Sequence, residues 1–229
     1  MNISNFKYLD KKCKKFIDKN EVDVLFEIGS RDCLDAIALN EFYNKKVYSF
    51  ECNPASIELC KQNLIEQRIT NDRVELFEIA VFNENKNIDF HPVVSSKIGV
   101  SSVFKISKDF QLKKFKRERH AQGEKITVPA VRLDTFMLAN NLDRIDLLCM
   151  DLQGAELMAL EGLGEKLKKV KYIITELCTS VEKDGEIWEY YDGQGKIKDV
   201  FKLLEDNGFK KVFGNENRFS HDDFGFIKE

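Results

Sequence analysis

Two apolar segments near the amino terminus each end in an acidic residue, and their spacing strongly constrains the fold. Val22–Gly29 reads VDVLFEIG and leads into a glycine turn, while Val47–Pro54 reads VYSFECNP. Glu51 ends the second apolar run, 22 residues after Gly29. In a doubly wound α/β sheet, the turn after the first strand holds the polar end of a nucleotide ligand, and an acid at the tip of the second strand binds ribose hydroxyls. The pattern therefore predicts a parallel sheet that binds an adenosine-containing cofactor.

Composition predicts one globular domain spanning residues 1–229. Hydrophobic residues make up 43% of the chain and include 18 Phe, so a packed core is expected. The net charge of −3 gives no overall reason to expect nucleic acid as a partner. The chain shows no apolar window of about 18 residues and no secretion signal at its start, so we expect no membrane span. Six cysteines without a CxxC pair favour a reduced, cytoplasmic setting.

Hydrophobic periodicity predicts strands that alternate with helices. A leading amphipathic helix is expected over residues 4–18, within a leading segment 1–20, and Pro54 opens another helix at a favoured first-turn position. The remaining expected elements are strands at 22–29, 47–51, 74–81, 145–152 and 170–178, a helix carrying Leu157, Leu160 and Leu163, a helix at 196–206, and a hairpin formed by 209–213 and 224–227. This order predicts a mostly parallel seven-stranded sheet with an antiparallel C-terminal hairpin and helices on both faces.

Two segments interrupt this pattern. Residues 83–129 form a long insert of the kind that serves as a lid or binding loop, and 179–195 contain Trp188, Tyr190 and Tyr191. These aromatic side chains suit stacking against a sugar ring, or else they pack the insert onto the body. Residues 105–125 carry eight Lys/Arg and three Asp/Glu, a local charge of +5. Such a run suits a phosphate-bearing ligand, with a solvated helix or mobile loop as the alternative.

The order and spacing of the motifs resemble the FkbM-type methyltransferases over roughly residues 22–178. The matching motifs are FEIGS, FECNP, the Ala80-Val81 step, GVSSVFK at 99–105, VRLDTFM at 131–137, RIDLLCMDLQGAELMALEG at 144–162 and IITEL at 173–177. The resemblance implies a Rossmann-like class I fold and methyl transfer from S-adenosylmethionine, usually to an oxygen of a sugar or other small metabolite, with S-adenosylhomocysteine as product. The chain departs from the family at Arg31-Asp32-Cys33 in the first turn. It also carries Gln153 where the family has an acid, which weakens any case for a metal there.

Together with this resemblance, the residues at the strand ends predict the cofactor site. Amides of the first turn and of the helix start that follows it would hold the methionine carboxylate, with Glu27 beside its ammonium group or, alternatively, facing water. Glu51 would accept both ribose hydroxyls, and the next two residues would flank the adenine or simply pack the loop. The predicted cofactor-binding residues are Glu27, Gly29, Ser30, Arg31, Glu51, Cys52, Asn53, Ala80, Ser102 and Asp151.

The predicted catalytic residues are Asp151, Glu176 and His221. Asp151 ends a strand at the ligand-binding edge, where it would orient a hydroxyl and take its proton; capping the following helix is a compatible alternative. Glu176 ends the next strand and would position the acceptor, or share a divalent metal with Asp151, although we expect no metal. His221, like His91, becomes a base only where its loop folds over the site. Glu156 is expected to be structural, in the first turn of its helix.

The predicted function is O-methylation of a hydroxyl on a saccharide or nucleotide-linked sugar, with an anionic small-molecule acceptor. A nicotinamide-dependent oxidoreductase is disfavoured because Arg31 stands where Gly-x-Gly-x-x-Gly needs its second glycine. Nucleic-acid methylation is disfavoured because no Asp/Asn-Pro-Pro-aromatic motif ends the fourth strand. The alternative is a non-catalytic methyltransferase-like module that binds a partner through its basic insert. The sequence leaves homodimer formation open.

Overall fold

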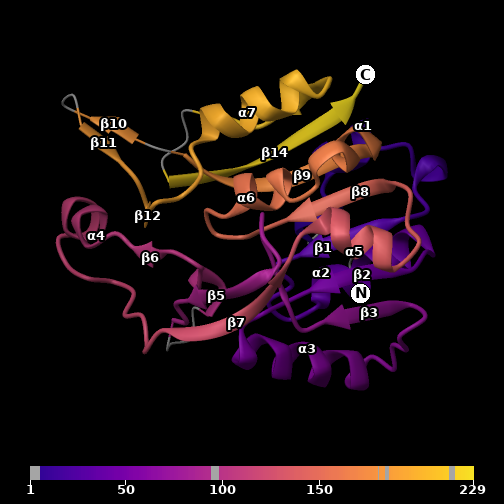
Figure 1. The fold of residues 1–229 in the computed structure, drawn as a ribbon, viewed down its shortest axis with the longest axis horizontal. Coiled ribbons are helices and arrows are strands. Elements are labelled where there is room, and N and C mark those ends of the chain that lie inside the picture. Colours follow the sequence, from indigo (N-terminus) through magenta and orange to yellow (C-terminus); the bar gives the residue numbers. More distant parts are fainter. Residues whose placement is uncertain (1–5, 94–97, 180, 184–185, 217–219) are drawn as a thin grey trace.

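A computed structural model describes residues 6–93, 98–179, 181–183, 186–216 and 220–229. Its centre is a seven-stranded sheet with the order β13-β14-β9-β8-β1-β2-β3 (Figure 1). Strands β9, β8, β1, β2 and β3 run parallel, whereas β14 is antiparallel to both β9 and β13. The predicted Rossmann-like sheet with its antiparallel hairpin is therefore confirmed. The strands are β1 Leu25–Ile28, β2 Val47–Phe50, β3 Val74–Phe77, β8 Ile145–Met150, β9 Val170–Thr179, β13 Phe209–Phe213 and β14 Ser220–Lys228.

Helices cover both faces of this sheet. Strand β8 shows why its sequence is apolar throughout: Leu147 packs into the core on one face and Leu148 into the core on the other. The first face carries η2 Lys7–Leu9, α1 Lys11–Phe16, α2 Leu34–Tyr43 and α3 Pro54–Glu66. The second face carries α5 Leu133–Ala139, α6 Glu156–Glu161, η5 Gly164–Lys169 and α7 Ile197–Asp206. The η3 turn Lys19–Glu21 leads into β1.

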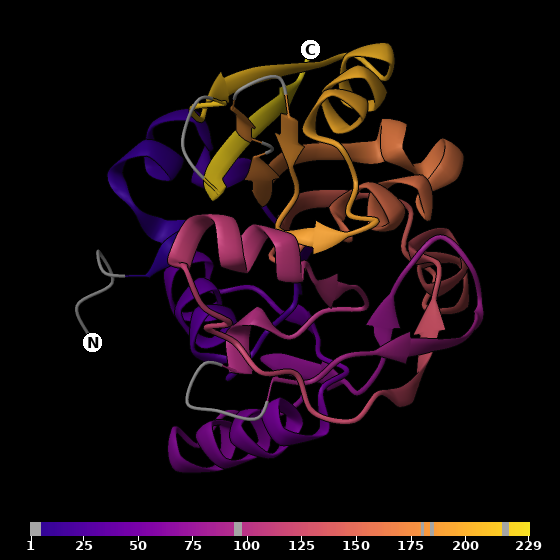
Figure 2. The same ribbon diagram turned by 90° about the vertical axis from the view of Figure 1, so that its left-hand side faces the viewer.

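Smaller elements lie beyond the carboxyl ends of the parallel strands (Figures 1 and 2). β4 Ala80–Val81 precedes the insert, which contains β5 Lys86–Phe90, η4 Ile98–Val100, β6 Lys105–Ile106 and α4 Lys108–Phe115 and leads into β7 Ile126–Val131. Strands β4, β7 and β5 make a separate three-stranded sheet. Later in the chain, β10 Val181–Lys183 pairs with β11 Glu186–Trp188, and β12 Tyr191–Asp192 pairs with β6. Segment 179–195, which contains β12, and the insert, which contains β6, thus meet beyond the carboxyl ends of the parallel strands.

Two predicted elements are wrong in their extent. The leading helix is interrupted because the Asp10 side chain accepts a hydrogen bond from Cys13 N at 2.8 Å and caps α1, which begins only at Lys11. Residues 4 and 5 of that prediction lie outside the described residues. The predicted strand 74–81 divides because Ile79 N bonds back to Phe77 O at 2.9 Å, after which β4 leaves the main sheet and pairs with β7.

Within the described ranges, no helix combines the length and the apolar character that crossing a membrane requires. None of the six cysteines forms a disulfide bond.

Candidate functional site

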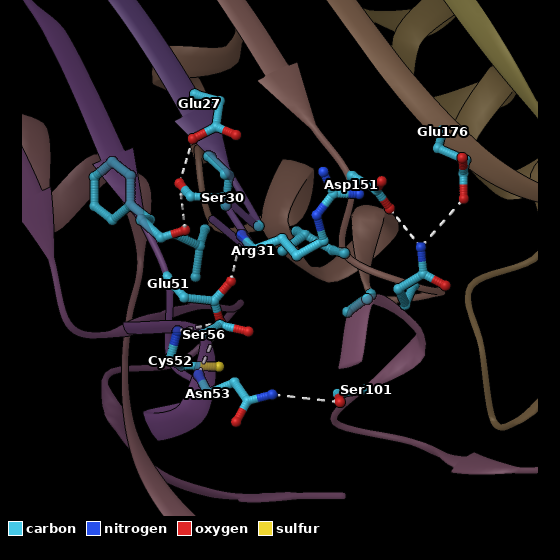
Figure 3. Close-up of a pocket in the computed structure, with 18 of the residues that line it drawn as sticks. Glu27, Ser30, Arg31, Glu51, Cys52, Asn53, Ser56, Ser101, Asp151 and Glu176 are labelled. Carbon is cyan, nitrogen blue, oxygen red and sulfur yellow. Dashed lines mark hydrogen bonds between the residues drawn. The ribbon is translucent and has the colours of Figure 1, made fainter. Parts of the chain in front are cut away.

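A cavity of about 560 Å³ opens at the carboxyl ends of β1, β2 and β8 (Figure 3). Strand β1 lies between β2 and β8 here, which is the crevice where open α/β sheets bind ligands. The volume falls in the range of small-molecule sites. The structure brings together at this cavity all ten residues predicted to hold the cofactor: Glu27, Gly29, Ser30, Arg31, Glu51, Cys52, Asn53, Ala80, Ser102 and Asp151.

The turn after β1 depends on Gly29. Its φ is +86°, in the left-handed region, and a Cβ built on it would lie 2.0 Å from Asp151 O. Asp151 N in turn donates to Ile28 O at 2.9 Å. The backbone at the end of β8 therefore approaches the turn so closely that only glycine fits.

Replacing Gly29 by alanine is expected to lower the free energy of unfolding by more than the left-handed backbone conformation alone would cost. The matched control is Gly193→Ala, because Gly193 has a φ of +89° but its Cβ would meet no atom closer than 3.7 Å. Both variants incur the left-handed cost, while only Gly29→Ala adds overpacking of roughly 1–3 kcal/mol. Urea denaturation measures the difference, and equal losses of unfolding free energy would contradict the close approach.

Glu27 is buried at the end of β1, so the alternative that it faces water is wrong. Its carboxyl group accepts from the hydroxyls of Ser30 and Ser49, the latter at 3.0 Å. Burial raises the pKa of Glu27 well above its usual value. The carboxyl group thus ties the turn to β2 from inside the protein.

The amides of this turn bond within the chain. Gly29 N and Ser30 N both donate to Phe50 O, at 2.9 and 3.1 Å, and Arg31 N donates to Glu51 Oε2 at 2.8 Å. Phe50 O and the Glu51 carboxylate already accept from these three amides, so the predicted contact with a ligand carboxylate stays a prediction for the start of α2 alone. The turn is organised around the end of β2.

Glu51 is the acceptor for several backbone donors. Its Oε1 takes bonds from Cys52 N and Asn53 N at 2.8 and 2.7 Å, while Oε2 takes only the one from Arg31 N. Burial raises the pKa of Glu51, and these three bonds oppose that shift. A carboxylate has about four acceptor positions, so Oε2 retains one for a ligand hydroxyl.

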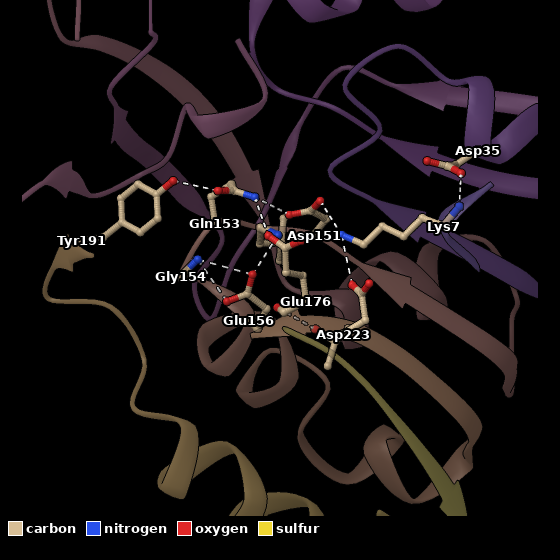
Figure 4. Close-up of polar contacts among 11 residues, drawn as sticks. Lys7, Asp35, Asp151, Gln153, Gly154, Glu156, Glu176, Tyr191 and Asp223 are labelled. Atoms are coloured by element: carbon tan, nitrogen blue, oxygen red, sulfur yellow. Dashed lines mark hydrogen bonds and ion pairs between the residues drawn. The ribbon is translucent and has the colours of Figure 1, made fainter. Parts of the chain in front are cut away.

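Asp151 and Glu176 meet at the far side of the cavity in a connected cluster (Figure 4). Gln153 Nε2 donates to Asp151 Oδ1 at 2.5 Å and to Glu176 Oε1 at 3.2 Å. The Tyr191 hydroxyl donates to Gln153 Oε1 at 2.7 Å and so orients the amide. The alternative that Asp151 caps the next helix is wrong, because α6 has Ala155 at its N-cap with no side-chain bond.

Sequence reasoning missed Lys7 as a member of this cluster. Its Nζ lies 2.7 Å from Asp151 Oδ2, 2.9 Å from Glu176 Oε2 and 3.3 Å from Asp223 Oδ1. Burial disfavours the ammonium, but the three carboxylates outweigh it and raise the pKa of Lys7. Burial and the neighbouring Asp151 raise the pKa of Glu176. No motif signals Lys7, since it precedes Asp151 by 144 residues in a segment that reads only as amphipathic.

Glu156 is buried beneath the cluster and accepts hydrogen bonds from Leu152 N and Gly154 N, at 2.8 and 3.1 Å. Burial raises its pKa to about 8. Because the folded pKa exceeds the unfolded one, the protonated form is favoured in the native state. The contribution of Glu156 to stability is therefore fully present at low pH and declines as pH rises toward 8.

The substitution Glu156→Gln is expected to remove this loss of stability with rising pH. Between pH 5 and 8 the wild type should lose up to roughly 1.4 kcal/mol per pH unit relative to the variant, which cannot ionise. Urea denaturation of both proteins across that range measures the difference between them, in which other titrating groups cancel. Parallel stability curves would contradict the assignment.

A second cavity of about 560 Å³ adjoins the first and shares Asp151, Gln153 and Glu176 with it. His221 lines this second cavity, whereas His91 and His120 line neither. Tyr190 also lines it, with its ring 4.9 Å from that of Phe110 on α4.

For the aromatic residues of 179–195, the sequence left open stacking against a sugar or packing of the insert. Tyr191 is fully buried, which favours packing over stacking for that residue, and the side chain of Trp188 lies outside what the structure describes. Ser102 is buried and donates to Gln153 O at 2.8 Å, which links the insert to the cluster. Over the described part of the chain, no group of three His, Cys, Asp or Glu side chains is arranged to hold a metal ion.

Comparisons with known proteins agree on one family. Residues 17–211 match the methyltransferase FkbM domain. The chain is 30% identical over 185 residues to the 2-O-methyltransferase NoeI of Sinorhizobium fredii (strain NBRC 101917 / NGR234), covering 79% of this chain and 70% of that protein. Its fold is similar to the crystal structure of methyltransferase FkbM from Methylobacillus flagellatus KT, with a TM-score of 0.54 at 11% identity over 99% of this chain. This chain spans 48% of that solved chain, about half its length.

Proposed function

The chain belongs to the FkbM methyltransferase family, and on that premise we propose that it transfers a methyl group from S-adenosylmethionine to a hydroxyl of a saccharide or nucleotide-linked sugar. One observation carries the proposal: the Asp151–Glu176 pair stands where the two cavities meet. A donor in the first cavity and an acceptor in the second would come together at these carboxylates.

The first cavity fits S-adenosylmethionine. Glu51 offers its remaining acceptor position to a ribose hydroxyl. The adenine would lie beyond it, against the apolar wall of Phe50, Ile79, Ala80 and Phe90 beside Cys52 and Asn53. At the opposite end, three carboxylates face one ammonium, and this excess of negative charge suits a sulfonium. When bound, the cofactor supplies an electrophilic methyl group, whose C–S bond breaks with its electron pair left on sulfur.

Asp151 is assigned as the base that orients the acceptor hydroxyl. An alcohol has a pKa far above 7, so its proton must be taken as the new C–O bond forms. Each oxygen of Asp151 accepts one bond, from Lys7 or from Gln153, and so keeps acceptor capacity for the substrate. The proton passes from the hydroxyl to this carboxylate and then to solvent. Glu176 would hold the hydroxyl beside it, since alignment is the main demand of this displacement.

The second cavity suits a sugar acceptor. Tyr190 and His221 line it, and an aromatic face with a few polar groups is typical of such sites. The insert and the segment 179–195 contribute Gly99 and Tyr191 to its walls. Nearby, residues 105–125 carry their local charge of +5, which favours a phosphate-bearing acceptor. Methylation at oxygen is further supported by the relative named a 2-O-methyltransferase.

Transfer of label from methyl-labelled S-adenosylmethionine tests this function directly. The protein is incubated with a panel of free sugars, sugar phosphates, nucleotide-linked sugars and, as controls, amines and carboxylic acids. The proposal expects an alkali-stable methyl ether on a sugar, with the nucleotide-linked forms preferred. Label confined to amines or carboxyl groups would contradict it. Tight binding of an anionic sugar without turnover would favour a non-catalytic binding module instead.

A further inference from the structure

Lys7 is held in place from both its backbone and its side chain. Its N–H donates to Asp35 Oδ1 at 3.2 Å on α2, and the following Tyr8 and Leu9 are buried in the core on that face. The side chain then extends to the edge of the first cavity, where Nζ bonds Asp151 and Glu176 (Figure 4). A lysine held at both ends loses its usual flexibility, so its ammonium occupies one defined position.

The ammonium works in concert with Gln153. Each carboxylate of the Asp151–Glu176 pair accepts one bond from Lys7 and one, on its other oxygen, from Gln153. The two acids are thereby clamped side by side although their like charges repel. Of the two donors that bridge the pair, Gln153 is neutral and Lys7 carries the positive charge. His221 also favours the ionised form of Glu176 from outside this clamp.

We propose that Lys7 is a positioning residue for methyl transfer, which holds Asp151 and Glu176 side by side at the junction of the two cavities. The inference rests on the proposed function. A third carboxylate also lies beside the Lys7 ammonium, since Asp223 Oδ1 is 3.3 Å from Nζ. The ammonium therefore acts through the acids and leaves ligand binding to other groups.

Carboxylate titration by 13C NMR tests the inference without any acceptor. In Lys7→Met, the pKa of Glu176 should rise by about 1–3 units, because a cation 2.9 Å from its carboxylate is removed. Lys7→Arg should restore values near the wild type. Lys11→Met, at an exposed position on α1, is the matched control and should change nothing. Asp223 also loses its ion pair with Lys7, so its NMR signal is assigned separately from that of Glu176. The other charged or titratable residues around the cluster are the same in all these variants: Tyr8, Glu27, Arg31, Asp35, Glu51, Cys149, Glu156, Cys178, Tyr191 and His221.

The direction of the NMR shift separates this role from a structural one. If Lys7→Met merely released the segment around η2, Glu176 would become hydrated and its pKa would fall toward that of an exposed carboxyl group. A fall, or no change, would overturn the proposal. A fall that arginine does not reverse would identify a purely structural lysine.

Kinetics and binding complete the test once an acceptor is known. In Lys7→Met, kcat for methyl transfer should fall roughly 100-fold with KM for S-adenosylmethionine little changed, because the two acids lose their alignment, and Lys7→Arg should recover most of the rate. The affinity for S-adenosylhomocysteine should stay within a few-fold of the wild type. Loss of that affinity, with retained binding of methylthioadenosine, would overturn the proposal by showing that Lys7 holds the methionine carboxylate. Absence of any methyl transfer by the wild type would count against the proposed function and leave the NMR result standing.

Discussion

An Asp151→Asn protein is expected to bind S-adenosylhomocysteine as the wild type does and to turn over roughly 10²–10⁴-fold more slowly. Asparagine keeps the size of the side chain and an oxygen that accepts from Lys7, but it cannot take a proton from an alcohol. The product S-adenosylhomocysteine carries no charge on sulfur, so its affinity does not report the lost negative charge. Single-turnover methyl transfer and calorimetry on the same preparation separate the two effects.

Asp143→Asn is the matched control, because Asp143 is fully exposed in the loop before β8 and makes only a 3.7 Å ion pair with Lys166. That variant should show wild-type turnover. Wild-type turnover by Asp151→Asn would show that Asp151 is not the base. The proton would then have to pass to Glu176 or His221, which line the same second cavity.

Glu51→Ala is expected to weaken binding of S-adenosylhomocysteine by roughly 10- to 150-fold, since a hydrogen bond to a charged group contributes about 1.5–3 kcal/mol. The change also orphans Arg31 N, Cys52 N and Asn53 N, which shape the end of β2. Calorimetry with an analogue lacking the ribose hydroxyls distinguishes the two causes. The wild type should prefer the natural ligand, and Glu51→Ala should bind both ligands equally.

A preference that survives in Glu51→Ala would show that the ribose binds elsewhere and that the loss comes from the distorted loop. Glu58→Ala serves as the control variant. Glu58 is an exposed carboxylate on α3, with its side chain 78% exposed, and its removal should leave both affinities unchanged.

Local sequence patterns were enough to predict most of the fold and the position of the first cavity. The apolar runs before Gly29 and Glu51 are short, so parallel strands were the natural interpretation, and their ends must meet at one sheet edge. Those two constraints bring the residues predicted to bind the cofactor to one cavity without any knowledge of distant contacts. The hairpin of β13 and β14 was equally readable, because two apolar runs flank a polar loop.

Long-range contacts account for what the sequence could not predict. Lys7 reaches Asp151 across 144 residues, and nothing in an amphipathic segment distinguishes a solvated lysine from one that is drawn inward by acids. Gln153 read as a departure that weakened the site, yet its amide bonds both acids. The division of strand 74–81 likewise depends on β7, whose pairing with Ala80 lies 50 residues away along the chain.

A crystal structure with S-adenosylhomocysteine bound is the decisive test of the proposed site. We expect the ligand in the first cavity, with a ribose hydroxyl on Glu51 Oε2 and the sulfur facing Asp151 where the two cavities join. Lys7 should keep its bonds to Asp151 and Glu176 in that complex. A ligand seated in the second cavity, or a sulfur turned away from the Asp151–Glu176 pair, would contradict it.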